Sequence, residues 1–126
     1  MSYQHALTTL QWSTDPEKEG YGDCMEFEAS KDLIKKIEDD WNSFESQALE
    51  MGFDPEVHRV ESYDPSQGTL WDYVAHDFIL TRNGHGSGFW DTARWAEPYA
   101  TKLTELSKKF GEINIYLSDE NLLEAY

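Results

Sequence analysis

The chain has 126 residues, with 10 lysines or arginines against 25 aspartates or glutamates, so its formal net charge is −15 at pH 7. So acidic a surface repels the phosphates that dominate nucleic-acid affinity, and we expect no direct binding to DNA or RNA. The length fits a single domain, and 39% hydrophobic residues are enough to form a buried core.

The negative charge is concentrated in the first half of the chain. Residues 1–64 contain 16 acids and five bases, whereas residues 65–126 contain nine acids and five bases. An acidic field speeds encounter with a partner that has a basic surface, although surplus carboxylates also serve solubility.

The cysteine content and the lack of long apolar stretches favour a cytoplasmic protein. Cys24 is the only cysteine, so the chain cannot form an internal disulfide, which is typical of a reducing compartment. Residues 1–12 lack the basic region and the long apolar run of a signal peptide, and no stretch approaches 18 apolar residues. We therefore expect a cytoplasmic protein of the host cell with no membrane association.

Residues 3–12 are ambiguous, because Leu7 and Leu10 have helical spacing whereas the threonines suit a strand. We favour a short helix there. Residues 13–24 contain Pro16, Gly20 and Gly22 among charged residues, and they predict a loop.

The clearest helix is predicted over residues 30–51. Ser30 is a suitable N-cap, and Gly52 stands where a left-handed residue would end the helix. Lysines and aspartates four residues apart predict ion pairs on the exposed side, Lys35 with Asp39 and Lys36 with Asp40. The apolar stripe recurs every three or four residues: Ile34, Ile37, Trp41, Phe44, Ala48 and Met51.

Asp54-Pro55 and Asp64-Pro65 each indicate a turn. Asp64 could cap a short helix over residues 65–75, with Pro65 in its first position. Its inward residues would be Leu70, Trp71 and Val74.

Residues 77–90 change to the period of a strand, because Phe78, Leu80 and Arg82 alternate with Ile79 and Thr81. Asn83-Gly84 is a strong hairpin signal, and Gly86 and Gly88 make the turn wide or bulged. Phe89 and Trp90 would continue the returning strand.

The end of the chain predicts a helix over residues 98–110, a strand over residues 113–117 and a turn at 119–121, followed by a short apolar tail. The helix begins with Pro98 in its first turn and closes at Gly111. Its apolar stripe consists of Tyr99, Leu103, Leu106 and Phe110.

Together these elements predict an α+β domain. A small three-stranded antiparallel sheet would combine the hairpin at about 77–90 with the strand at about 113–117. The helices at about 30–51, 65–75 and 98–110 would pack on one face of that sheet.

The segment HDFILTRNGHGSGFWD, from His76 to Asp91, is the richest in polar residue types that can carry function. It resembles the HDFWLTRNGHGAGFWD signature of a family of small uncharacterised bacteriophage proteins, departing from it at Ile79 and Ser87. Segments elsewhere, ALTTLQWST, EDDWNSFESQA and KLTELSKKFGEINIYLSDE, extend the resemblance over nearly the whole chain. The resemblance implies a phage or prophage origin and implies no reaction.

Three interpretations of this segment are open. In a structural one, the aromatic residues are sheet core and Arg82 pairs with a carboxylate such as Asp91. In the second, the glycine-rich turn binds an anionic small molecule, with Arg82, Asn83 and His85 as donors and Trp90 or Trp95 as a stacking face. In the third, His76, His85, Asp77 and Asp91 bind a metal, but no recognised ligand spacing is present. We predict no metal and no cofactor.

Nucleophilic catalysis has little support. Cys24 lies among acids, which raise a thiol pKa, and Ser87 in Gly-Ser-Gly does not match a nucleophile elbow. We assign no catalytic residue, consider an enzyme the less favoured interpretation, and expect His5 and His58 to be ordinary surface histidines.

The favoured hypothesis is therefore a phage-encoded acidic accessory protein that binds and modulates a host protein with a basic surface. An anti-defence inhibitor or a DNA mimic would both fit, although Lys31, Lys35 and Lys36 interrupt the acidic surface that mimicry needs. The alternative is a small-molecule or nucleotide-binding domain, with or without catalysis, built around the glycine-rich hairpin 82–91. Under either hypothesis the binding residues are predicted to be Arg82, Asn83, His85, Trp90 and Asp91, with Asp91 orienting Arg82.

Overall fold

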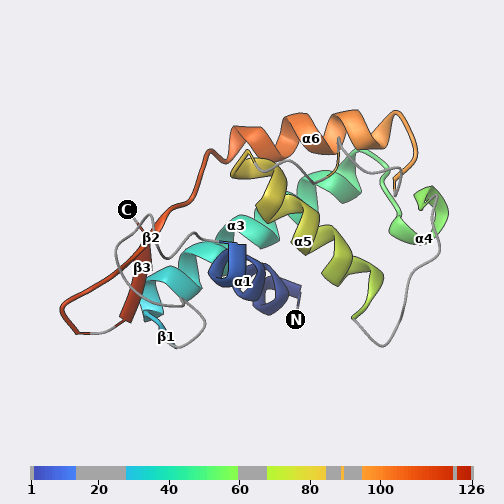
Figure 1. Cartoon of the computed structure of the whole chain (residues 1–126). Coiled ribbons are helices and arrows are strands. Elements are labelled where there is room, and N and C mark those ends of the chain that lie inside the picture. The colour runs from blue at the N-terminus through green and yellow to red at the C-terminus, as the bar shows by residue number, and fades with distance from the viewer. Residues whose placement is uncertain are drawn as a thin grey trace.

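The computed structural model describes residues 2–13, 28–59, 68–84, 89, 95–120 and 122–125. Its fold class is α+β, as predicted, but the sheet is mixed rather than antiparallel and is built from other segments. None of the described helices is long and apolar enough to cross a membrane. In chain order the elements are α1 (Ser2–Ser13), β1 (Glu28–Ala29), α3 (Lys31–Glu50), α4 (Pro55–His58), α5 (Leu70–Arg82), α6 (Tyr99–Lys109), β2 (Ile115–Leu117) and β3 (Leu122–Ala125) (Figure 1).

Helix α3 confirms the predicted helix and both of its ends. The Leu33 N–H donates to Ser30 Oγ at 3.1 Å, which makes Ser30 the N-cap, and Gly52 has φ 92° just beyond the C-terminus. The ion pairs also form, with 3.3 Å between Lys35 and Asp39 and 3.2 Å between Lys36 and Asp40. The buried stripe differs from the predicted one in two places, because Ile34 and the C-cap Met51 are only half-buried and Leu33 is buried instead. Its members are Leu33, Ile37, Trp41, Phe44 and Ala48.

The helices predicted near the two ends of the chain are confirmed. Residues 3–12 lie within α1, and residues 98–110 correspond to α6, which is followed by Gly111 with φ 75°. On α6, Leu103 and Leu106 are buried while Tyr99 and Phe110 are partly buried, so the stripe faces the core. The Asp54-Pro55 turn is the start of the short helix α4, capped by Asp54.

The predicted hairpin over residues 77–90 is wrong where the structure describes it, because residues 77–82 are the second half of α5. The helix predicted over 65–75 therefore starts later, at Leu70, and ends later, at Arg82. Thr69 is the N-cap and forms a capping box with Asp72. Nearly every side of α5 is covered, so its sequence shows no amphipathic stripe. The buried residues are Leu70, Val74, Ala75, Asp77, Phe78, Ile79, Leu80, Thr81 and Arg82.

Asn83-Gly84 ends this helix instead of turning a hairpin. The Asn83 N–H donates to the Ile79 carbonyl and the Gly84 N–H to the Thr81 carbonyl, each at 3.2 Å, and Gly84 has φ 70°. A left-handed glycine is required at a helix C-terminus as much as in a tight hairpin, so the dipeptide fits both. Of the expected returning strand, the buried Phe89 lies in a turn, and residues 85–88 and 90 lie outside the described residues.

The sheet lies at one end of the molecule, beside the start of α3, and α4 lies at the opposite end (Figure 1). Its strand order is β1-β3-β2, with β1 parallel and β2 antiparallel to β3. The strand predicted over 113–117 is confirmed as β2, but the apolar tail beyond the turn at 119–120 is β3, the central strand. The Ser30 N–H donates to the Leu123 carbonyl at 2.8 Å, which joins α3 to the sheet.

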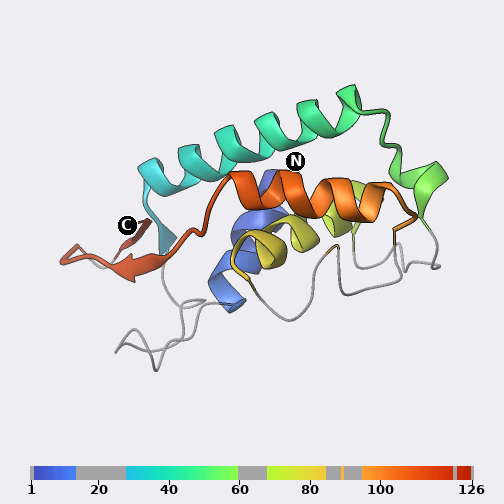
Figure 2. The same ribbon diagram turned by 90° about the horizontal axis from the view of Figure 1, so that it is seen from above.

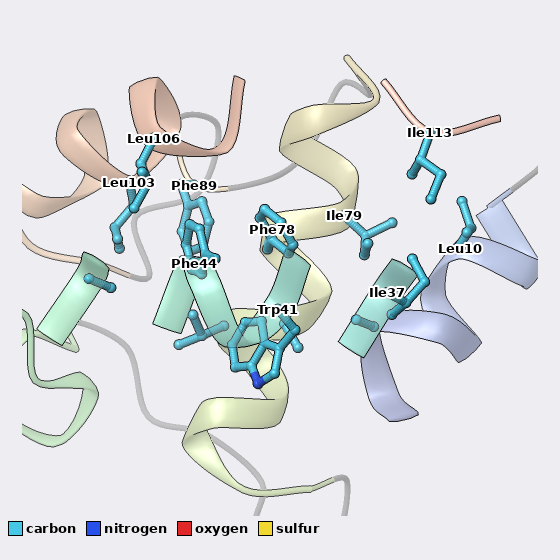
Figure 3. Packing of buried hydrophobic residues seen from close by; sticks show 14 of the residues in the cluster. Leu10, Ile37, Trp41, Phe44, Phe78, Ile79, Phe89, Leu103, Leu106 and Ile113 are labelled. Atoms are coloured by element: carbon cyan, nitrogen blue, oxygen red, sulfur yellow. The ribbon is translucent and has the colours of Figure 1, made fainter. Parts of the chain in front are cut away.

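The helices pack on one another rather than on one face of the sheet. Helices α3 and α6 run alongside each other, and α1 packs chiefly against α5 (Figure 2). Stacked phenylalanines fill the centre of this core (Figure 3), with 4.3 Å between the ring centroids of Phe44 and Phe78 and 5.9 Å between those of Phe44 and Phe89. The core is therefore mainly helical, and the sheet closes one end of it.

Trp41 tests whether the α3 stripe supports this core. Its side chain is 2% exposed and its ring contacts those of Phe44, Trp71 and Phe78. Trp41→Ala is expected to lower the free energy of unfolding by about 3–5 kcal/mol, because a buried ring leaves a cavity. Urea denaturation followed by circular dichroism measures the loss.

The exposed neighbour on α3 provides the control for Trp41. Asn42→Ala removes a side chain from the same helix without touching the core, so it should change the stability by less than about 0.5 kcal/mol. Equal effects of the two substitutions would contradict a supporting role for the stripe.

Candidate functional site

Arg82, the first of the five predicted site residues, is buried at the end of α5, with its side chain 0% exposed. Its guanidinium donates to the Gly111 carbonyl at 2.8 Å, to the Phe110 carbonyl at 3.0 Å and to Asp40 Oδ2 at 2.9 Å. Burial lowers the pKa of Arg82, and Asp40 opposes that change by hydrogen bonding and by its charge. The residue therefore fastens α5 to α3 and to the carbonyls at the end of α6.

The side-chain amide of Asn83, the second predicted site residue, bonds to the backbone that leads into β2. Its Nδ2 donates to the Ile113 carbonyl at 3.1 Å, and its Oδ1 accepts from the Ile113 N–H at 2.8 Å. The amide thus makes the pair of bonds that a neighbouring strand would make. Arg82 and Asn83 together hold the segment between α6 and β2 against the end of α5.

The described structure contains two of the five predicted residues, and both have partners within the protein. The polar groups of Arg82 and Asn83 bond within the protein. Among the described residues, Asp40 balances the positive charge of Arg82. His85, Trp90 and Asp91 lie outside the described residues. Sequence reasoning did not identify Asp40 as the partner of Arg82, because Asp40 already had a plausible partner in Lys36, which it also binds.

The histidine and aspartate at the start of the segment from His76 to Asp91 form a second polar cluster. Asp77 is 1% exposed, and its Oδ2 accepts from Trp95 Nε1 at 2.8 Å, while its Oδ1 lies 3.2 Å from His76 Nδ1. Trp95 is itself buried rather than presented as a stacking face. No group of three or more histidines, cysteines or acids in the described ranges could hold a metal ion.

The two histidines expected at the surface both make specific contacts, so that expectation is wrong. His58 Nδ1 accepts from the Asp54 N–H at 3.0 Å, and its ring lies 4.1 Å from that of Tyr99. The half-buried His5 faces His76 across the contact between α1 and α5, with 6.4 Å between ring centroids. Burial, the largest cause, lowers the pKa of His5, Asp72 raises it and His76 lowers it further.

Two surface hollows among the described residues include neither Arg82 nor Asn83 in their lining. One hollow of about 580 Å³ beside the turn between β2 and β3 is lined by Tyr116, Ser118, Asp119, Glu120 and Glu124, three of them carboxylates and none of them basic. A groove of about 390 Å³ between α3 and α6 has charges of both signs: its lining residues are Gln47, Glu50, Met51, Lys102, Glu105, Leu106 and Lys109. The charge of the first hollow is thus the more one-sided of the two.

Comparisons with models of protein families, with curated proteins and with solved structures found no match for this chain.

Replacing Arg82 tests its structural role. Arg82→Ala should lower the free energy of unfolding by about 1.5–3 kcal/mol, because it removes the donor to the Phe110 and Gly111 carbonyls and one of the two cations bound to Asp40. Thermal and urea denaturation of the purified variant measure the change.

Lys36 supplies the matched control, since it binds the same oxygen of Asp40 at 3.2 Å but is exposed. Lys36→Ala should cost less than about 1 kcal/mol. Wild-type stability in the Arg82 variant would show that the guanidinium does not hold these elements together.

Proposed function

We propose that this protein is a phage-encoded acidic accessory protein that binds and modulates a host protein through a basic surface of that partner. The observation that carries the proposal is the excess of 25 acids over 10 bases. Three of the bases, Lys35, Lys36 and Arg82, are already paired with Asp39 or Asp40 inside the molecule. The field that reaches a partner is therefore negative, and it favours encounter with a positive surface.

The hollow beside the β2–β3 turn supports this proposal by its composition. Asp119 and Glu120 are exposed, and Tyr116, 37% exposed, lies within 3.4 Å of Glu124 through its hydroxyl group. Carboxylates around an aromatic ring suit a lysine or arginine side chain, which gains both ion pairing and contact with the ring face. We propose that this surface takes part in the contact with the host protein.

The ion pairs on α3 bear on how such a protein could act. DNA presents phosphates of one sign only, whereas Lys35 and Lys36 alternate with Asp39 and Asp40 along the exposed face of α3. This alternation is typical of a solvated helix, and it favours direct recognition of a host protein over DNA mimicry by α3.

Capture of host proteins on the immobilised full chain tests the proposal. We expect a protein with a basic surface to bind, to be released when the salt rises from about 0.05 M to about 0.5 M, and to lose its activity when bound. The turn variant Asp119→Lys/Glu120→Lys should reduce this capture strongly.

The control variant is Glu50→Lys/Glu105→Lys, which makes the same change in net charge on the exposed groove between α3 and α6. It should retain most of the binding. If no salt-sensitive host protein is captured, the proposed function fails; if both variants bind equally, the turn is not the contact surface.

The same charge predicts the outcome of a direct DNA-binding assay. Micromolar protein should not shift duplex DNA in a gel at about 0.15 M salt, because the net charge of −15 repels the phosphates. A shift that survives this salt concentration would overturn the prediction.

A further inference from the structure

Helix α1 packs against α5 and α3. Among its described side chains, Ala6, Thr9 and Leu10 are buried, and Tyr3 and Leu7 are partly buried. Leu10 lies among Ile37, Ile79 and Ile113 (Figure 3).

Two imidazoles meet in the contact between α1 and α5. His5 of α1 and His76 of α5 have ring centroids 6.4 Å apart and planes inclined by 58°. Both side chains are partly exposed, so protons can reach them from solvent. At this separation two imidazolium rings repel each other, whereas two neutral rings do not.

A carboxylate lies near each ring of the pair. Asp77 Oδ1 lies 3.2 Å from His76 Nδ1, and the other oxygen of Asp77 accepts from Trp95. Asp72 acts on His5 from α5, but its Oδ2 accepts from the Thr69 N–H in the capping box. Among the described residues, the ionisable groups that act on His5 are Asp72 and His76, and none belongs to α3.

We propose that the His5–His76 contact is a pH-sensitive latch that releases α1 from α5 in mildly acidic conditions. Charging His5 places a cation in this half-buried helix–helix contact, beside the ring of His76. Release would uncover the apolar side chains around Leu10, including Ile79 of α5 (Figure 3). The released form therefore has an apolar surface that the closed form lacks.

The direction of the pH effect follows from His5. Its pKa lies below the ordinary 6.5 while α1 is docked, and a released α1 restores the ordinary value. The released form thus binds the proton more tightly, so protons favour release. Docking is fully stabilised above pH 6.5 and weakens as the pH falls below that value.

Amide hydrogen exchange on the full chain tests the latch, with rates corrected for the intrinsic pH dependence of exchange. Between pH of about 7.5 and about 5.5, the opening equilibrium of the α1 amides should rise several-fold, while that of the α3 amides changes less. His5→Gln removes the titrating group, and the α1 response should disappear.

His58→Gln is the matched control, because His58 lies on α4 and contacts Tyr99 and Phe53 rather than α1. It should keep the full α1 response. His76→Gln serves as a second variant if His5→Gln does not fold, and it should also diminish the response. Equal opening of α1 at both pH values in the wild type, or an unchanged response in the histidine variants of the latch, would overturn the proposal.

Discussion

The burial of α5 on nearly all of its sides is the constraint on which the rest of the structure depends. Helices α1, α4 and α6 contact it directly, and α3 reaches it through the stacked rings of Phe44 and Phe78. A helix that is covered in this way has no solvent-exposed face for its polar residues. Every polar side chain on its buried surface must find a partner inside the protein, since an unpaired one is costly.

Those partners are what fix the remaining segments. Asp77 accepts from the Trp95 indole, Thr81 Oγ1 accepts from the Phe89 N–H, and Arg82 binds the end of α6. Each of these side-chain bonds joins α5 to a segment that makes no regular backbone hydrogen bonds with α5. Within the segment HDFILTRNG, the polar residues at 77 and at 81–83 therefore have structural roles.

The local sequence predicted correctly the helices that have one apolar face and a terminating residue. It gave the wrong secondary structure for the helix that is buried on nearly all sides. The stripes of α3 and α6, together with Ser30, Gly52 and Gly111, predicted both helices within one or two residues. In α5 the run Phe78 to Thr81 alternates by chance, because all its positions are buried and the helical period is hidden. Strand β3 pairs with β2 across the short turn that the sequence predicted, so its apolar residues could have been assigned to a strand. Only its pairing with β1 joins segments about 90 residues apart, and no local pattern encodes that pairing.

The candidate site could be predicted less well than the fold, for a related reason. The partner of Arg82 is 42 residues away in the chain, and the sequence offers many carboxylates at other separations. Residue type showed that Arg82 needed an anion, and only the packing of α3 on α5 selected Asp40. The same packing buries Arg82 and bonds the half-buried Asn83 to the backbone of Ile113, so the polar groups of both have partners within the protein.

The behaviour of His5 shows how local structure prevails over this overall charge. A net charge of −15 would by itself hold protons on a histidine and raise its pKa, yet the pKa of His5 is lowered. Salt screens the distant carboxylates beyond a Debye length of about 8 Å, whereas burial and the ring of His76 act at contact distance. Asp72 opposes them from α5 and is outweighed by burial. The acidic surface and the histidine contact therefore respond to different variables, the first to ionic strength and the second to pH.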